Sequence, residues 1–169
     1  MSRIDDFGPY TCQQLREIAQ QIHEFHPPYQ QPDVIRACDG PGEITKIIEN
    51  LHNGRPCIVL WRQTPEYGHF IALLRRGACL ELFDPLGGES HGGLQKYLQP
   101  PMGPFSRSLN GGDWIRRIFE HWADSGGRCE YNSAGPQHHR AESCGLWCLT
   151  RTVHKHLQPA VFARKFAGK

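Results

Sequence analysis

A chain of 169 residues with 38% hydrophobic residues has the size and composition of one domain, so we expect a single domain spanning residues 1–169. Its net charge of +2 comes without a basic block or tail, which gives no indication of a nucleic-acid-binding protein. No run of about 18 apolar residues occurs, and Asp5 and Asp6 stand where a signal peptide would be apolar, so we expect an intracellular protein without membrane attachment.

The first half of the chain predicts two helices followed by a group of strands. Apolar residues recur every three to four positions in Thr11–Phe25 and again in Glu43–His52, which is typical of amphipathic helices. The apolar runs Pro56–Trp61, His69–Leu74 and Cys79–Phe83 predict three strands. A short turn with Gly separates the last two runs, so we expect them to form a hairpin within a sheet.

The second half predicts loops that alternate with shorter elements. Gly and Pro are frequent from Leu86 to Gly112, which predicts a surface loop with one short helix around Leu94–Leu98. After this loop, the patterns predict a helix from Asp113 to Trp122, a strand at Cys129–Tyr131, and helices at Cys144–Leu157 and Pro159–Ala167.

The cysteines indicate a reducing environment rather than a disulfide framework or a metal site. There are seven, an odd number, at irregular spacings in a chain large enough to fold without cross-links. No Cys-X-X-Cys motif occurs, and the close pair Cys144 and Cys148 lies within an apolar helical pattern. We therefore expect no metal and no cofactor.

Cys144 is the candidate nucleophile. A thiol attacks a carbonyl only as the thiolate, which a neighbouring imidazolium and a helix N-terminus both favour. Cys144 opens the predicted helix, and Gly145 directly after it would let the backbone pass close to a substrate. Taken alone, Cys144 would be interpreted as a small buried residue like Cys148.

A histidine and a carboxylate occupy matching ends of the predicted hairpin. Gly68-His69 begins one strand, and Asp84 follows the end of the next. If the strands pair, the two side chains can meet across the sheet. The carboxylate would then hold the imidazole in one tautomer and stabilise its protonated form.

Gln137 is the candidate oxyanion donor. It lies in the loop before Cys144, where its side-chain amide could donate a hydrogen bond to the negative oxygen of a tetrahedral intermediate. The backbone N–H of Cys144 would supply a second donor. Such a donor typically contributes a factor of about 10² to 10³ in rate.

The order of these four residues resembles that of a known family. The matching strings are Gly68-His69, Phe83-Asp84-Pro85-Leu86-Gly87, and Gln137 followed after six residues by Cys144-Gly145-Leu146-Trp147-Cys148. Together they resemble the cysteine proteases of clan CE, which include the adenovirus protease (adenain) and the SUMO-specific proteases. The resemblance covers roughly residues 56–157. The six-residue gap and the Cys-Gly-Leu-aromatic-Cys run are closer to the adenovirus protease.

This resemblance implies an α+β fold, with a central mixed sheet flanked by helices, and a cysteine endopeptidase that cleaves protein substrates after glycine. It favours a protease of a virus or virus-like element that matures capsid or polyprotein precursors in the host cytoplasm or nucleus, or within the virion. We expect a monomer. The resemblance assigns Cys144, His69, Asp84 and Gln137 to catalysis, and Gly68, Phe70 and Gly145 to substrate binding.

The chain also departs from the family pattern. Phe70 stands where the family usually has Trp, which implies a weaker cation–π contact with the imidazole. Asp84 matches the SUMO-protease branch, because the adenovirus protease has Glu there. Fewer residues follow Cys144 than in the adenovirus protease, so activation by a peptide or by DNA comes to this chain by resemblance only.

Four other interpretations remain open. A papain-like order would use Cys12 as the nucleophile, but no glutamine precedes it to serve an oxyanion hole. The SUMO-protease branch would favour removal of SUMO or another ubiquitin-like modifier. YopJ-type acetyltransferases of the same clan, or a binding module that has kept the fold without the chemistry, are further alternatives.

Overall fold

The computed structural model describes residues 3–36, 41–62, 68–87, 112–138 and 140–166. The short helix predicted at Leu94–Leu98 and most of the loop predicted around it lie outside the described residues. No helix in the described part of the chain is long and apolar enough to span a bilayer.

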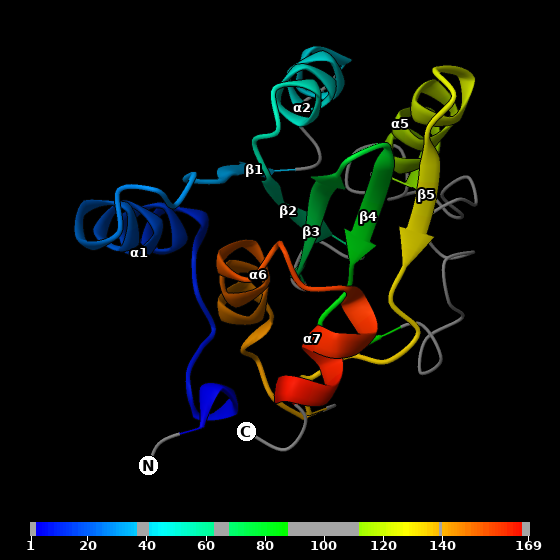
Figure 1. The fold of residues 1–169 in the computed structure, drawn as a ribbon. Helices are drawn as coiled ribbons and strands as arrows, with labels where there is room; N and C mark the ends of the chain where they lie inside the picture. Colours follow the sequence, from blue (N-terminus) through cyan, green and yellow to red (C-terminus); the bar gives the residue numbers. More distant parts are fainter. Residues whose placement is uncertain (1–2, 37–40, 63–67, 88–111, 139, 167–169) are drawn as a thin grey trace.

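The centre of the molecule is a five-stranded mixed sheet with the strand order β1-β2-β3-β4-β5 (Figure 1). The strands are β1 (Asp33–Arg36), β2 (Cys57–Arg62), β3 (Gly68–Arg76), β4 (Cys79–Phe83) and β5 (Arg128–Tyr131). The three central strands pair antiparallel, whereas β1 and β5 each join an edge in parallel orientation. The predicted β3–β4 hairpin is confirmed, and the edge strand β1 was not predicted.

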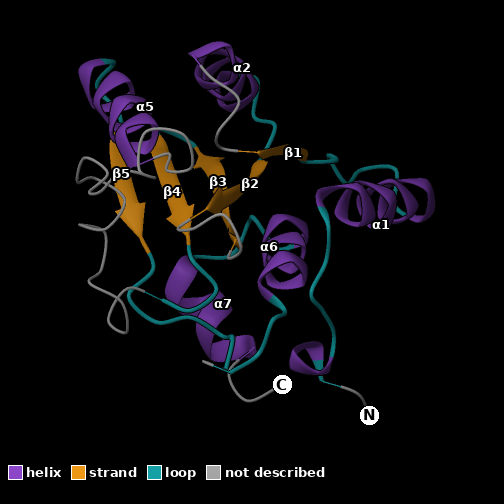
Figure 2. Cartoon of the chain, turned by 180° about the vertical axis from the view of Figure 1, so that it is seen from behind, coloured by secondary structure: helices purple, strands orange, loops and turns teal. Residues whose placement is uncertain are grey.

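Helices cover both faces of this sheet (Figure 2). They are α1 (Cys12–Phe25), α2 (Pro41–His52), α5 (Gly112–Asp124), α6 (Cys144–Val153) and α7 (Pro159–Phe166), and a short 3-10 turn, η1 (Ile4–Asp6), precedes them. The α+β class with a central mixed sheet flanked by helices is therefore confirmed.

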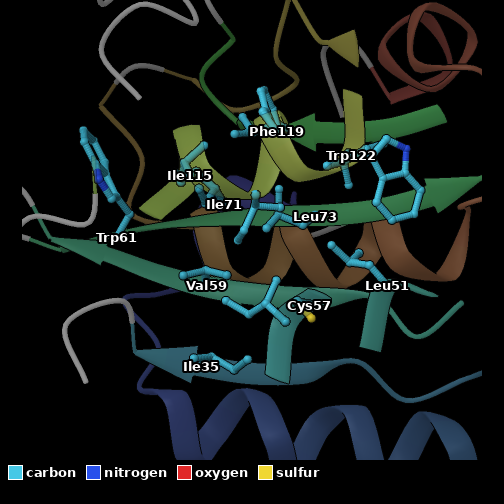
Figure 3. Packing of buried hydrophobic residues seen from close by; sticks show 14 residues of the cluster. Ile35, Leu51, Cys57, Val59, Trp61, Ile71, Leu73, Ile115, Phe119 and Trp122 are labelled. Carbon is cyan, nitrogen blue, oxygen red and sulfur yellow. The ribbon is translucent and has the colours of Figure 1, made fainter. Parts of the chain in front are cut away.

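Two hydrophobic clusters sit on opposite faces of the sheet because successive strand residues point to opposite sides. Ile71 and Leu73 of β3 pack with α2 and α5 (Figure 3). Phe70, Ala72 and Leu74 of the same strand pack with α1, α6 and α7. The second face is the one that carries the helix of the candidate nucleophile.

Helix α1 begins where the sequence predicts, and its first turn explains why. The Thr11 hydroxyl accepts a hydrogen bond from the Gln14 amide at 3.1 Å, and the Gln14 side chain accepts one from the Thr11 amide at 2.8 Å. This is a capping box, which satisfies two amides that the helix itself leaves unpaired. The far end differs from expectation, because Phe25 is 81% exposed and does not belong to the buried stripe.

A buried ion pair fastens α6 to β4. Arg151 of α6 donates from Nε and Nη2 to the two carboxylate oxygens of Glu81 at 2.8 and 2.7 Å, and both side chains are 0% exposed. Arg151 also donates from Nη1 to the His154 carbonyl and from Nη2 to the Leu157 carbonyl. Arg76 also bonds Glu81, at 3.0 Å. The carboxylate and the guanidinium are thus both supplied with partners, as buried charges require.

Candidate active site

His69 and Asp84 form a buried pair across the β3–β4 hairpin. Nε2 of His69 lies 2.8 Å from Oδ1 of Asp84, and the side chains are 6% and 0% exposed. Ala72 is opposite Phe83 in the hairpin register, so Asp84, one step beyond β4, comes opposite Ile71 and on the face of His69. A diagonal pair of this kind is within reach of longer side chains. The two side chains therefore meet as the spacing predicts.

Cys144 lies at the first position of α6, as predicted. Its thiol hydrogen-bonds the ring of His69, and the backbone amide of Phe70 donates to Sγ at 3.5 Å. The backbone amide of Gly145 also favours the charged form of this thiol. Because Nε2 of His69 faces Asp84, Nδ1 is the ring nitrogen left to take the proton of the thiol. The imidazole thus bridges a carboxylate and a sulfur.

Hydrogen bonding at this site favours the charged forms of both partners. Burial would lower the pKa of His69, but the hydrogen bonds and charges of Asp84 and Cys144 raise it to about 9. Burial likewise acts to raise the pKa of Cys144, yet the hydrogen bonds with His69 and with the amides of Phe70 and Gly145 lower it below its usual value. Both shifts favour a thiolate beside an imidazolium over the neutral thiol and imidazole.

Other thiols lack this setting. Burial raises the pKa of Cys57 to about 12 and that of Cys79 to about 11. Burial also raises the pKa of Cys148, one turn after Cys144 on α6, well above its usual value. Cys144 is therefore chemically distinct from these three cysteines, which lie in apolar strand or helix segments.

Asp84 is held in place through its backbone by a residue that the sequence did not single out. Asn132, which follows β5 and is 5% exposed, accepts a hydrogen bond from the Asp84 amide at 2.7 Å and donates one to the Asp84 carbonyl at 2.6 Å. The Leu86 amide donates to Oδ1 of Asp84 at 2.9 Å. The carboxylate therefore has both a fixed backbone and a second hydrogen-bond donor besides His69.

The turn that follows Asp84 lies directly against the loop that carries Gln137. The Gln137 amide donates to the Pro85 carbonyl at 3.0 Å. A Cβ on Gly135 would lie 2.5 Å from the carbonyl carbon of Leu86, so only glycine permits this approach. These backbone contacts fix the position of the loop relative to the His69–Asp84 pair.

Gln137 itself is 8% exposed, and its Nε2 donates to the Ala141 carbonyl at 2.5 Å. Oε1 has no hydrogen-bond partner among the described residues. A side-chain amide carries two N–H donors, so one is left for an oxyanion. Gln137 also lines a pocket of about 490 Å³ between its loop and the N-terminal turn, which Cys144 and His69 do not line. Its role at the oxyanion stays a prediction.

The three residues expected to bind substrate fall at the same end of the sheet. Gly68 begins β3 and is exposed, whereas Phe70 is 4% exposed within the core. A Cβ on Gly145 would lie 2.9 Å from a Leu15 methyl carbon and 3.2 Å from the Phe70 ring. The structure thus gives Phe70 and Gly145 a packing role, and their contact with substrate stays a prediction.

The alternative nucleophile, Cys12, is the first residue of α1 and is 9% exposed. Both ring nitrogens of His69 are taken up by Asp84 and Cys144, so none is left for Cys12. Within the described residues, no group of three His, Cys, Asp or Glu side chains could hold a metal ion.

No protein-family model matches the chain, and no curated protein sequence matches it significantly. The resemblance to clan CE therefore stands on the motifs alone, and what the site can do must be argued from its geometry.

Proposed function

We propose that this protein is a cysteine peptidase in which Cys144 is the nucleophile and His69 its acid–base partner. Asp84 orients His69, and Gln137 donates to the oxyanion together with the backbone of Cys144. The observation that carries the proposal is that the His69 ring bridges a fully buried carboxylate and a thiol at a helix N-terminus.

The chemistry follows from this arrangement. The thiolate attacks the carbonyl carbon of the scissile bond, and the Gln137 side-chain amide and the backbone N–H of Cys144 stabilise the oxyanion that forms. His69 then gives its proton to the leaving amine as the peptide bond breaks, which leaves a thioester on Cys144. His69 takes a proton from water, the hydroxide attacks the thioester carbonyl, and cleavage of the C–S bond restores the thiolate beside the imidazolium. Atoms and protons balance without a cofactor.

The substrate class comes from the resemblance. Relatives in clan CE cleave after glycine, because a residue without a side chain can pass through a narrow approach to the sulfur. We propose cleavage of protein substrates after Gly-Gly or Gly-X, with maturation of viral or virus-like precursors as the role. Asp84, which matches the SUMO-protease branch, favours removal of a ubiquitin-like modifier as the second candidate.

The proposal is tested by incubating the protein with three reporters side by side: Leu-X-Gly-Gly peptides, SUMO and ubiquitin, each with a fluorogenic leaving group. We expect cleavage after glycine by the wild type. Cys144→Ala should reduce kcat below detection, since loss of a nucleophile can cost about 10⁶-fold. The peptide reporter alone being cleaved would favour precursor maturation, and the SUMO reporter being preferred would favour deconjugation.

Cys12→Ala is the matched control. It removes another buried thiol at a helix start in the same hydrophobic cluster. We expect it to retain cleavage. Retained cleavage by Cys144→Ala together with loss in Cys12→Ala would overturn the assignment and favour the papain-like order.

A further inference from the structure

A carboxylate of the N-terminal turn η1, that of Asp5, contacts residues next to the candidate active site. Asp5 precedes Ser143 by 138 positions, yet its Oδ1 accepts hydrogen bonds from Ser143 Oγ at 2.7 Å and from Trp147 Nε1 at 2.8 Å. Its Oδ2 accepts one from the His138 amide at 3.0 Å. The His138 amide directly follows the proposed oxyanion residue, Ser143 directly precedes the candidate nucleophile, and Trp147 lies in the first turn of α6. Asp5 therefore ties together both segments that would serve the oxyanion.

The bond to Ser143 changes how α6 begins. Ser143 is the N-cap residue, and a serine there usually accepts a hydrogen bond from the amide of the second or third helical residue, here Gly145 or Leu146. The Ser143 side chain makes no such bond: its backbone has φ −90° and ψ 12°, outside the extended conformation of an N-cap, and its hydroxyl donates to Asp5. The Gly145 amide instead helps to lower the pKa of the Cys144 thiol. Asp5 thus holds the Ser143 hydroxyl away from the first amides of α6.

Gly8 provides a second contact between the N-terminal segment and the same loop. Its φ is +123°, and a Cβ there would lie 2.9 Å from the carbonyl carbon of Glu142 and 3.4 Å from Cα of Ser143. Glycine alone combines this backbone conformation with such a close approach. The segment therefore packs directly on the residues that precede the nucleophile, and both views place η1 at the end of the molecule where α6 begins (Figures 1 and 2).

Asp5 has the charge that three donors require. Burial acts to raise its pKa, but the hydrogen bonds from Trp147, Ser143 and the His138 amide lower it below the usual value. At neutral pH the group is a carboxylate with all three donors satisfied. Asp6, its neighbour in the same turn, is exposed and accepts a hydrogen bond from the Arg3 amide at 2.7 Å.

We propose that Asp5 is a positioning residue for the nucleophile and the oxyanion loop: it fixes Ser143 and His138 so that the helix N-terminus stays available to the Cys144 sulfur. The inference rests on the proposed function. Asp5 does not touch the reacting atoms and acts through the backbone on either side of them.

The first test is the kinetic split of Asp5→Ala against Asp6→Ala. Asp5→Ala removes every acceptor for the three donors, and misplacement of a catalytic group by about 1 Å can cost about 10²-fold. We expect kcat to fall about 10- to 100-fold with KM within about twofold. Asp6→Ala changes the same turn without touching the loop, so its kcat should match that of the wild type.

The second test follows the thiolate directly and needs no substrate. The rate of Cys144 alkylation by iodoacetamide is measured against pH, with the modified residue identified by mass spectrometry. In Asp5→Ala the freed Ser143 hydroxyl draws the Gly145 amide away from the sulfur, so alkylation should begin at higher pH. Adding Ser143→Ala removes this competitor and should return the onset toward the wild-type pH. The other ionisable groups that face the sulfur, His69 on β3 and Cys148 on α6, are the same in every variant.

This reversal separates positioning from stability. If Asp5→Ala only loosened the fold, a second deletion would not restore the alkylation profile. Asp5→Asn serves where Asp5→Ala fails to fold, because it keeps one oxygen for Ser143 and Trp147 and loses only the acceptor for His138. Its kcat should lie between those of the wild type and Asp5→Ala, and a kcat equal to that of Asp6→Ala would overturn the proposal.

The outcomes for Asp5 and for the proposed function are distinct. A wild type that cleaves all expected reporters, with Asp5→Ala indistinguishable from Asp6→Ala in kcat and alkylation, overturns the role of Asp5 alone. A wild type that cleaves none of them, with alkylation that shifts in Asp5→Ala and recovers in Asp5→Ala/Ser143→Ala, overturns the peptidase and supports the positioning of the sulfur by Asp5.

Discussion

Two buried ion pairs have their carboxylates three residues apart, one on β4 and one directly after it. The pairs differ in whether their cation can release its proton. Glu81 pairs with Arg151 in a bidentate contact, and the guanidinium also donates to two backbone carbonyls. Asp84 pairs with His69 through one ring nitrogen only, and the second nitrogen faces Cys144. A guanidinium keeps its proton at any physiological pH, whereas an imidazole exchanges one.

One strand and the residue after it thus carry both a pair with a permanent cation, Glu81–Arg151, and a pair whose cation titrates, Asp84–His69. The Arg151 pair holds the helix of the nucleophile to the strand that leads to the acid, and nothing about it changes when a proton moves. The His69 pair lies at the end of that strand, where the proposed reaction requires a proton to move. Changes to the first pair should therefore alter stability, and changes to the second should alter the proposed chemistry.

The largest effect is expected for Asp84→Asn. The amide keeps the size of the side chain but cannot stabilise the imidazolium, and it permits the wrong tautomer of His69. By analogy with the same change in catalytic triads, kcat should fall about 10³- to 10⁴-fold. KM should stay within about twofold, because the role is to orient His69. Steady-state kinetics on a glycine reporter decide this, and a change confined to KM would move Asp84 into the substrate site.

Arg151→Met should act on stability instead. It leaves Glu81 buried with only Arg76 to compensate its charge, so the free energy of unfolding should fall by about 3 kcal/mol. Replacing both partners, in Arg151→Met/Glu81→Leu, should recover most of that loss because no charge is left buried. Urea denaturation measures both.

A matched control for this pair is Arg116→Met, which breaks the exposed contact with Glu120 at 45% and 57% exposure. Such a pair contributes less than about 0.5 kcal/mol. A double variant of the buried pair that is no more stable than Arg151→Met would show that packing, and not the unpaired charge, dominates at this position.

The smallest effect is a shift in the pH profile of kcat/KM. Activity needs the thiolate and the imidazolium together, so it should rise with pH as Cys144 loses its proton, below the usual pKa of a thiol, and fall as His69 loses its own near pH 9. Both limbs belong to the coupled pair. Asp84→Asn removes a cause of the raised pKa of His69, so the alkaline limb should move to lower pH. An unchanged alkaline limb would mean that it reports another group.

Features coded by neighbouring residues could be predicted from the sequence. The hairpin follows from two apolar runs around a glycine turn, and its register carries His69 to Asp84. The position of Cys144 at a helix start follows from the apolar spacing after it. Helix α6 ends at Val153 and not at Leu157 as predicted. Val153 is 37% exposed, whereas Arg151 and Thr152 lie on the buried face of the helix.

Contacts between single polar residues far apart in the chain could not be predicted. Asn132 meets Asp84 across 48 positions, and Asp5 meets Ser143 across 138. No spacing or composition rule encodes such pairs. For the Glu81–Arg151 pair, the sequence does show charged residues within apolar patterns. Glu81 lies within the strand Cys79–Phe83, and Arg151 lies within the apolar stripe of α6. A buried charge needs a partner, but the sequence does not say which one.

The missing edge strand has a different cause. Strand β1 is only four residues long and gains its hydrogen bonds from β2, which lies more than twenty positions further along the chain. Val34 and Ile35 are too short a run to separate from a loop. The strand exists because the rest of the sheet offers it an edge, a property of the assembled fold.

The lack of a side chain at Gly145 has a consequence for how such a protein could adapt to a new temperature or be altered by directed evolution. The first turn of α6 rests on a Leu15 methyl group and the Phe70 ring with no room for one further carbon. A small change of volume in α1 is therefore passed on to the sulfur as a displacement, because close-packed interiors transmit strain. Selection that acts on the position of the Cys144 sulfur can therefore act through Leu15, an apolar side chain of another helix.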